Sequence, residues 1–111
     1  MVAASLLTEH VDRFNQGIRS GDWEPMLAHF TPDAELAFEG IPVGPFVGRQ
    51  AIAEAYRDQP PTDEVRLLEP PGEEDGVLVA DYAWARQGTR AGRMLLTPQD
   101  GAIARLVVTF E

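Results

Sequence analysis

The sequence contains no cysteine and no lysine. All nine basic side chains are Arg, so Schiff-base chemistry and the lysine of a phosphate-binding loop are excluded. Without cysteine, the 111-residue chain cannot form disulfides, thiol nucleophiles or thiolate metal sites. Any chemistry that the chain performs therefore depends on other side chains.

Positive charge is scarce. Nine basic side chains stand against eighteen acidic ones, which gives a net charge of −9. Each contact with a nucleic-acid phosphate or an anionic lipid headgroup needs a cation. This balance argues against nucleic acid and against a membrane surface as partners.

Long apolar runs are also missing. No stretch approaches the roughly 18 residues that a membrane-spanning helix requires. Residues 1–5 carry no basic side chain ahead of an apolar segment, as a signal peptide would. We therefore expect a cytoplasmic protein.

The sequence has enough apolar residues, 44% of the total, for one domain over residues 1–111. A chain of this length buries roughly two-thirds of its unfolded surface, so its core needs neither metal nor disulfides. We expect no cofactor and no metal, because the two histidines, His10 and His29, lie nineteen residues apart without a matching cluster of ligands.

Helical periodicity dominates the first sixty residues. Apolar positions recur every three or four residues over 6–20, which predicts a helix with one buried stripe. Shorter helices are predicted over 23–30 and about 49–58. The buried positions of the first helix are Leu7, Val11, Phe14 and Ile18. His10 falls beside the polar face, so we expect it to be exposed to solvent.

Strand patterns dominate the rest. Alternation over 34–39 places Ala34, Leu36 and Phe38 on one face of a strand. Four more strands are predicted over residues 64–69, 77–86, 90–97 and 102–111. Their short connections favour antiparallel pairing. The expected fold is α+β, a curved antiparallel sheet packed against three N-terminal helices.

Two of these strands place apolar groups on both faces. Leu106, Val107 and Val108 are consecutive, as are Val77, Leu78 and Val79. A small monomer leaves one face of an antiparallel sheet to water, so a second apolar face needs a cover. We therefore expect a homodimer that packs through the outer sheet face.

A set of short motifs follows the same order as these elements. They are Ser20-Gly21-Asp22-Trp23, Phe30-Thr31-Pro32-Asp33-Ala34-Glu35-Leu36, Gly48-Arg49-Gln50-Ala51-Ile52 and Asp100-Gly101-Ala102-Ile103. In this order the chain resembles the nuclear transport factor 2-like superfamily, on the side of SnoaL-like polyketide cyclases and ketosteroid isomerases. The resemblance spans about residues 6–111. It implies a cone-shaped barrel, a deep pocket between helices and sheet, and dimerisation through the sheet.

The resemblance does not supply a reaction. By position, Phe14 stands where ketosteroid isomerases have a tyrosine, and Phe38 stands where they have the carboxylate base. Their third group falls near Gly92 or Arg93. The catalytic set of the limonene epoxide hydrolase branch is also missing, and no histidine follows His29 to supply the cyclase pair.

Four polar side chains remain catalytic candidates. Asp81 lies in the middle of a strand: facing inward, its pKa would rise and make it a general base. Facing outward, it would pair with an arginine across the sheet, the candidates being Arg86, Arg93 and Arg105. Arg93 could bind an anionic oxygen or form an exposed salt bridge.

The other two candidates are Glu39 and His29. Glu39 follows Phe38 at the expected rim of the pocket, and it is either a second choice of base or a surface carboxylate. His29 ends the second predicted helix. Its imidazole suits acid–base work near neutral pH, or it complements the helix dipole.

The candidate ligand-binding residues are large and mostly apolar. They are Phe14, Ile18, Trp23, Phe30, Phe38, Tyr56, Tyr82 and Trp84. Such residues form the core by default, but in a cone-shaped fold the core and the pocket wall are one layer. The hydroxyls of Tyr56 and Tyr82 could orient a ligand.

Two functions compete at this point. One is an acid–base enzyme of the SnoaL-like kind that acts on a small apolar carbonyl or polyketide-like compound, with Asp81 or Glu39 as base and Arg93 or Tyr82 at the oxyanion. The other is a non-catalytic dimeric module that binds an apolar ligand or a protein. The missing catalytic sets favour the second.

Overall fold

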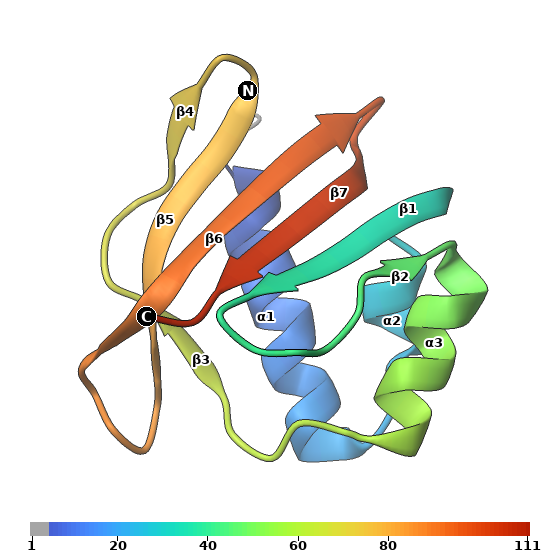
Figure 1. The fold of residues 1–111 in the computed structure, drawn as a ribbon, viewed down its shortest axis with the longest axis horizontal. Coiled ribbons are helices and arrows are strands. Elements are labelled where there is room, and N and C mark those ends of the chain that lie inside the picture. The colour runs from blue at the N-terminus through green and yellow to red at the C-terminus, as the bar shows by residue number, and fades with distance from the viewer. Residues whose placement is uncertain (1–4) are drawn as a thin grey trace.

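Three helices and seven strands make up the computed structural model, which describes residues 5–111 (Figure 1). The helices are α1 (Ser5–Ser20), α2 (Glu24–Leu27) and α3 (Arg49–Asp58). The strands are β1 (Phe30–Glu39), β2 (Phe46–Val47), β3 (Val65–Leu67), β4 (Gly72–Glu74), β5 (Val77–Trp84), β6 (Arg90–Gln99) and β7 (Ala102–Thr109). Within residues 5–111, no helix combines the length and the apolar character needed to cross a bilayer.

All seven strands belong to one sheet in the order β2-β1-β7-β6-β5-β3, with β4 pairing beside β5. The strands joined by short connections are antiparallel, as expected. The expectation of a wholly antiparallel sheet is wrong for β1 and β7, which run parallel. These two strands come from opposite ends of the chain, so no short connection dictates their relative direction.

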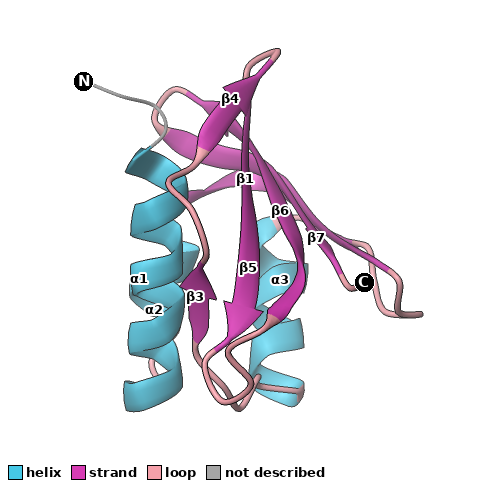
Figure 2. Ribbon diagram, turned by 90° about the vertical axis from the view of Figure 1, so that its left-hand side faces the viewer, coloured by secondary structure: helices cyan, strands magenta, loops and turns pink. Residues whose placement is uncertain are grey.

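The helices lie together on one side of the sheet, which is curved and not closed into a barrel (Figure 2). Irregularities in the strand register accompany the curvature, at Phe30/Glu35, Tyr82/Ala83 and Thr97/Pro98. A bulge bends its strand and increases the local twist. The α+β architecture that the sequence predicts is therefore confirmed, with an open sheet in place of a closed cone.

The first and the third predicted helices match α1 and α3. α3 has the predicted bounds, whereas α2 has only four residues. β1 starts at Phe30, so the segment Thr31-Pro32-Asp33, which lies between the predicted helix and the predicted strand, is part of the strand. The strand tolerates Pro32 because the register with β7 is interrupted between Phe30 and Glu35, where a missing N–H breaks no regular pairing.

Two short strands occupy segments that lie between the predicted elements. β2 falls within residues 40–48 and pairs with β1. β4 lies in the acidic segment 70–76 and forms a hairpin with β5, and its three residues are exposed. Asp75 and Gly76 make the turn with positive φ angles of 53° and 81°, the conformation that two-residue hairpin turns require.

A side chain on α1 holds the edge strand β3. The Asn15 amide donates a hydrogen bond to the Val65 carbonyl at 2.9 Å and accepts one from the Val65 N–H at 2.8 Å. This pair of bonds resembles the pairing of a further strand. It fixes β3 against α1 at one side of the concave face.

Tyr82 crosses the concave face from β5 to β7. Its Cα partner on β6 is Gly92, and its hydroxyl donates to the carbonyl oxygen of Thr109 at 2.9 Å. A Cβ atom at position 92 would collide with that carbonyl oxygen. Gly92 is therefore required for close contact between the strands beneath the tyrosine ring.

We expect Gly92→Ala to lower the free energy of unfolding by about 1–3 kcal/mol, the usual cost of overpacking. Gly72 in β4 is the matched control, because a Cβ there meets no atom within 4 Å. Gly72→Ala should change stability by less than about 0.5 kcal/mol. Urea denaturation of the three proteins measures the difference, and equal stabilities would contradict the assigned role of Gly92.

Candidate functional site

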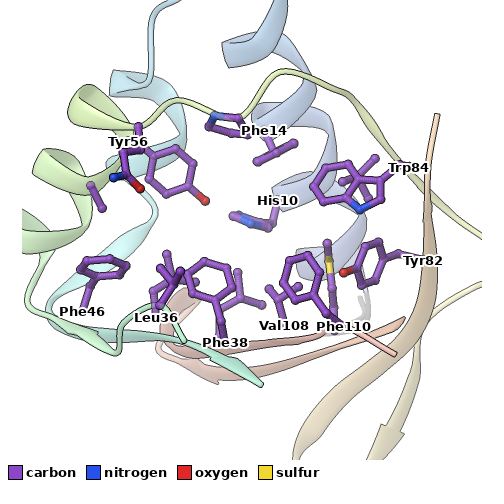
Figure 3. Close-up of a pocket in the computed structure, with 17 residues that line it drawn as sticks. His10, Phe14, Leu36, Phe38, Phe46, Tyr56, Tyr82, Trp84, Val108 and Phe110 are labelled. Carbon is purple, nitrogen blue, oxygen red and sulfur yellow. The ribbon is translucent and has the colours of Figure 1, made fainter. Parts of the chain in front are cut away.

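A pocket lies between the concave face of the sheet and helices α1 and α3 (Figure 3). Its volume is about 180 Å³. The lining residues are His10, Phe14, Leu36, Phe38, Val43, Phe46, Ala55, Tyr56, Gln59, Pro61, Val65, Tyr82, Trp84, Met94, Leu106, Val108 and Phe110. Val43 and Gln59 are exposed and mark the opening to solvent.

The pocket wall is almost entirely apolar. Within residues 5–111, no carboxylate or guanidinium group lines it. Its hydrogen-bonding side chains are those of His10, Tyr56, Gln59, Tyr82 and Trp84. A charged ligand would find no opposite charge on this wall, so the site suits a neutral molecule.

Five of the eight residues proposed to bind ligand line this pocket, namely Phe14, Phe38, Tyr56, Tyr82 and Trp84. Phe30 does not line it: its side chain is buried in the core, where its ring contacts that of His10. Trp23 and Ile18 line a separate surface hollow instead. The Trp23 ring packs 4.9 Å from the ring of Tyr56, on the far side of the pocket wall.

The structure places all four catalytic candidates outside the pocket. Alternate residues of a strand face opposite sides of the sheet, and the side chains of Tyr82, Met94 and Phe38 line the pocket. Their neighbours Asp81, Arg93 and Glu39 therefore face the other side of the sheet.

The fourth candidate, His29, lies in the turn between α2 and β1. Its side chain is half-buried and does not line the pocket. Its backbone carbonyl accepts a hydrogen bond from Ile103 at 2.7 Å, which begins the contact between β1 and β7. Burial and the positive charge of Arg13 lower the pKa of His29, and Glu9 opposes this shift.

Asp81 is part of an ion-pair network on the outer sheet face. Its carboxylate lies 3.0 Å from Nε of Arg90 and 3.1 Å from Nε of Arg93. Arg90 also contacts Glu111 at 2.7 Å. Hydrogen bonds from Arg90 and Arg93 lower the pKa of Asp81. The outward alternative for Asp81 is thus the one in the structure, and a carboxylate with a lowered pKa is a poor general base.

His10 is the polar residue that the sequence prediction misplaced. It was expected to face solvent, yet its side chain is 2% exposed and lies at the centre of the pocket wall (Figure 3). Its ring contacts Phe30 edge to face at 5.6 Å. Within residues 5–111, the buried Nδ1 atom has no hydrogen-bond partner. Burial, together with the nearby positive charges of Arg13 and His29, lowers the pKa of His10 from 6.5 to about 4.

The helical period contains the signal that locates His10. The residue follows Leu7 by three positions and precedes Phe14 by four, and both of these are buried. Positions related in this way share one face of a helix. His10 therefore belongs to the buried stripe. The sequence prediction assigned it to the exposed face because its side chain is polar.

The two tyrosines of the pocket differ in what their hydroxyls do. The Tyr82 hydroxyl already donates to Thr109, and burial, helped by the charge of Glu111, raises its pKa to about 12. The Tyr56 hydroxyl points into the cavity toward His10 (Figure 3). Burial raises the pKa of Tyr56 as well, so this group is a neutral hydrogen-bond donor.

Neither the pocket nor the outer face assembles a metal site. Among residues 5–111, no group of three or more His, Asp or Glu side chains lies close enough together to hold a metal ion. The chemistry open to the pocket is the binding of an apolar molecule with hydrogen bonds from imidazole and phenol groups.

Comparisons with known proteins agree with this architecture. A family model described as the SnoaL-like domain matches residues 11–110. No curated protein matches the sequence. Among solved structures, a protein from Sphaerobacter thermophilus is similar with a TM-score of 0.74 and 20% identity, over 100% of this chain and 97% of that one.

Two further solved structures have the same fold. A candidate isomerase from Bacillus subtilis has a TM-score of 0.70 and 16% identity, over 100% of this chain and 90% of that one. A nuclear transport factor 2-like protein of unknown function from Burkholderia xenovorans has a TM-score of 0.70 and 14% identity, over 96% of this chain and 84% of that one. At such identities the likeness shows the fold alone.

The lowered pKa of His10 predicts that the protein loses stability between pH 6.5 and pH 4. In this window the unfolded chain protonates His10 while the folded chain holds it neutral, so acid favours unfolding. The full loss is about 3 kcal/mol. Urea denaturation at a series of pH values measures this slope, which His10→Leu should largely remove.

His29→Asn is the control, because the pKa of His29 is also lowered but its side chain is only half-buried. This variant should keep most of the slope. The pKa values of Asp81 and Glu111 are lowered from 3.8 and 4.5, so the stability that these carboxyls contribute is lost mainly below this window. An unchanged slope in His10→Leu would show that His10 does not titrate in this way.

Proposed function

This chain belongs to the SnoaL-like domain family, and on that premise we propose that its pocket binds a small, neutral, mostly apolar molecule about the size of one substituted ring. The observation that carries the proposal is the pocket itself, about 180 Å³ with an almost wholly apolar wall. An apolar protein cavity of about 150 Å³ is large enough for benzene. The volume here therefore suits a six-membered ring with a small substituent.

Several features support binding over acid–base catalysis. The carboxylates Asp81 and Glu39 lie across the sheet from the pocket, as does Arg93. The imidazole that does line it, His10, has a pKa near 4. A general base works best when its pKa is close to the working pH, so His10 is a weak base at neutral pH and serves better as a hydrogen-bonding group.

The size of the pocket also sets the expected affinity. An aromatic ring buries about 150–250 Å² of surface. At about 25 cal/mol per Å², this burial contributes about 5 kcal/mol, which corresponds to a dissociation constant of roughly 0.1–1 mM. Binding of this strength is measurable by calorimetry or by ligand-observed NMR.

We expect toluene to bind in this range and Ala55→Phe to abolish the binding. Ala55 lies half-buried on α3 and lines the pocket, so a phenyl group there would occupy the cavity. Ala53 on the same helix is also half-buried but faces the surface hollows. Ala53→Phe should therefore keep the wild-type affinity. Equal affinity in the two variants would place the ligand elsewhere.

We also propose that two copies associate through the outer face of the sheet. The helices cover the concave face of the sheet and leave the outer face uncovered (Figure 2). The outer face carries charged side chains in ion pairs such as Arg105–Glu35 at 3.3 Å and Arg93–Asp81 at 3.1 Å. A second copy related by a twofold axis could present opposite charges to these groups. Val107 is only 6% exposed in one chain, so the contact depends on the charged side chains more than on an apolar patch.

Light scattering at micromolar concentration tests this association. We expect a mass about twice the 12.2 kDa of one chain. Arg93→Glu places a second negative charge beside Asp81 and should shift the protein toward the monomer. Arg57→Glu, at an exposed position of α3, is the matched control and should remain dimeric. A monomeric wild type would rule out the proposed dimer.

A further inference from the structure

The wall of the pocket contains a buried nitrogen with no protein partner among the described residues. His10 Nδ1 is enclosed, and residues 5–111 offer it no hydrogen bond. Buried polar atoms are almost always paired, so an exception calls for a partner that the chain itself does not provide. Although Nδ1 itself is closed off, His10 lines the ligand pocket, so a bound molecule meets the same side chain.

The position of His10 is fixed by its surroundings. The residue lies in the middle of α1, and its ring meets the edge of Phe30 at 5.6 Å. The charges that face it come from Arg13 on its own helix and from His29 in the turn before β1, and both disfavour protonation. Glu9 acts on His29 in the opposite sense. The imidazole is therefore presented to the pocket in its neutral form.

A second hydrogen-bonding group faces the same space. The Tyr56 hydroxyl points into the cavity toward His10 (Figure 3). The other tyrosine of the wall, Tyr82, already donates its proton to Thr109. His10 and Tyr56 are thus the pair of polar side chains that converge on the cavity from α1 and α3.

We propose that His10 is the residue that selects the ligand, and that the ligand is a neutral ring-sized molecule bearing a hydroxyl group. This inference rests on the proposed function of the pocket. A hydroxyl both donates and accepts a hydrogen bond. It can therefore pair with the neutral imidazole of His10 as donor or as acceptor, whichever tautomer is present, while it accepts from Tyr56.

Other polar groups suit this arrangement less well. A carboxylate or an ammonium group would enter the pocket without an opposite charge among the lining residues of 5–111. A carbonyl oxygen can only accept, so it pairs with the imidazole only in the tautomer whose N–H faces the cavity. A hydroxyl satisfies both kinds of group at once.

Phenol and toluene form a matched pair of probes, because they differ only in a hydroxyl and a methyl group of similar size. The informative quantity is the ratio of the phenol affinity to the toluene affinity, measured by calorimetry. We expect this ratio to fall about tenfold in His10→Leu, the effect of losing one hydrogen bond in a buried site. His10→Gln retains a hydrogen-bonding group and should keep a ratio closer to that of the wild type.

His29→Asn is the matched control, because it removes the other imidazole of the chain, whose side chain does not line the pocket. It should leave the affinity ratio unchanged. An equal ratio in the wild type and His10→Leu would overturn the role of His10, while the binding of both probes would uphold the proposed function. Failure of both probes to bind the wild type would contradict the proposed function and this inference together.

A measurement on the unmodified protein avoids any dependence on how the variants fold. The chain has two histidines, so ¹⁵N-labelled imidazole gives signals from His10 and His29 alone. We expect phenol to shift the ring nitrogens of His10 and to leave those of His29 unchanged. Toluene should cause a smaller shift, because it forms no hydrogen bond. Equal shifts from the two probes would show that His10 does not bind the hydroxyl.

Discussion

The curvature of the sheet is the constraint on which the rest of the structure depends. Three interruptions of register bend the long strands, and the concave face that results must be covered by apolar side chains. Straight helices cannot match a curved surface along its whole length. α1 is held close at one side, where Asn15 pairs with Val65, and the unfilled space between α1, α3 and the sheet is the pocket.

The same sheet separates charge from the pocket. Alternation along β5 and β6 sends Tyr82 and Met94 inward and Asp81 and Arg93 outward. The outer face then satisfies its charges in a network that needs no ligand. As a result, no carboxylate or guanidinium group is among the described residues that line the pocket. Such a wall suits a neutral molecule better than a charged one.

Sequence patterns predicted the positions of helices and strands better than the face of the element to which each side chain belongs. Helical periodicity located α1 and α3 because one apolar stripe is the dominant signal in each. The parallel pairing of β1 with β7 joins distant parts of the chain, and no local pattern encodes it. The direction of Asp81 was left open because β5 is apolar on both faces: Val79 on the outer side is also buried, with 8% of its surface exposed.

The pocket wall includes His10, a polar residue on the buried, otherwise apolar stripe of α1. Phe14 lies on the buried stripe of α1, and His10 lies one turn earlier on that stripe. The polar group that this helix presents to the pocket is therefore an imidazole. A neutral imidazole with a low pKa exchanges hydrogen bonds more readily than it abstracts protons. This imidazole therefore supports the proposed role in recognition over one in proton transfer.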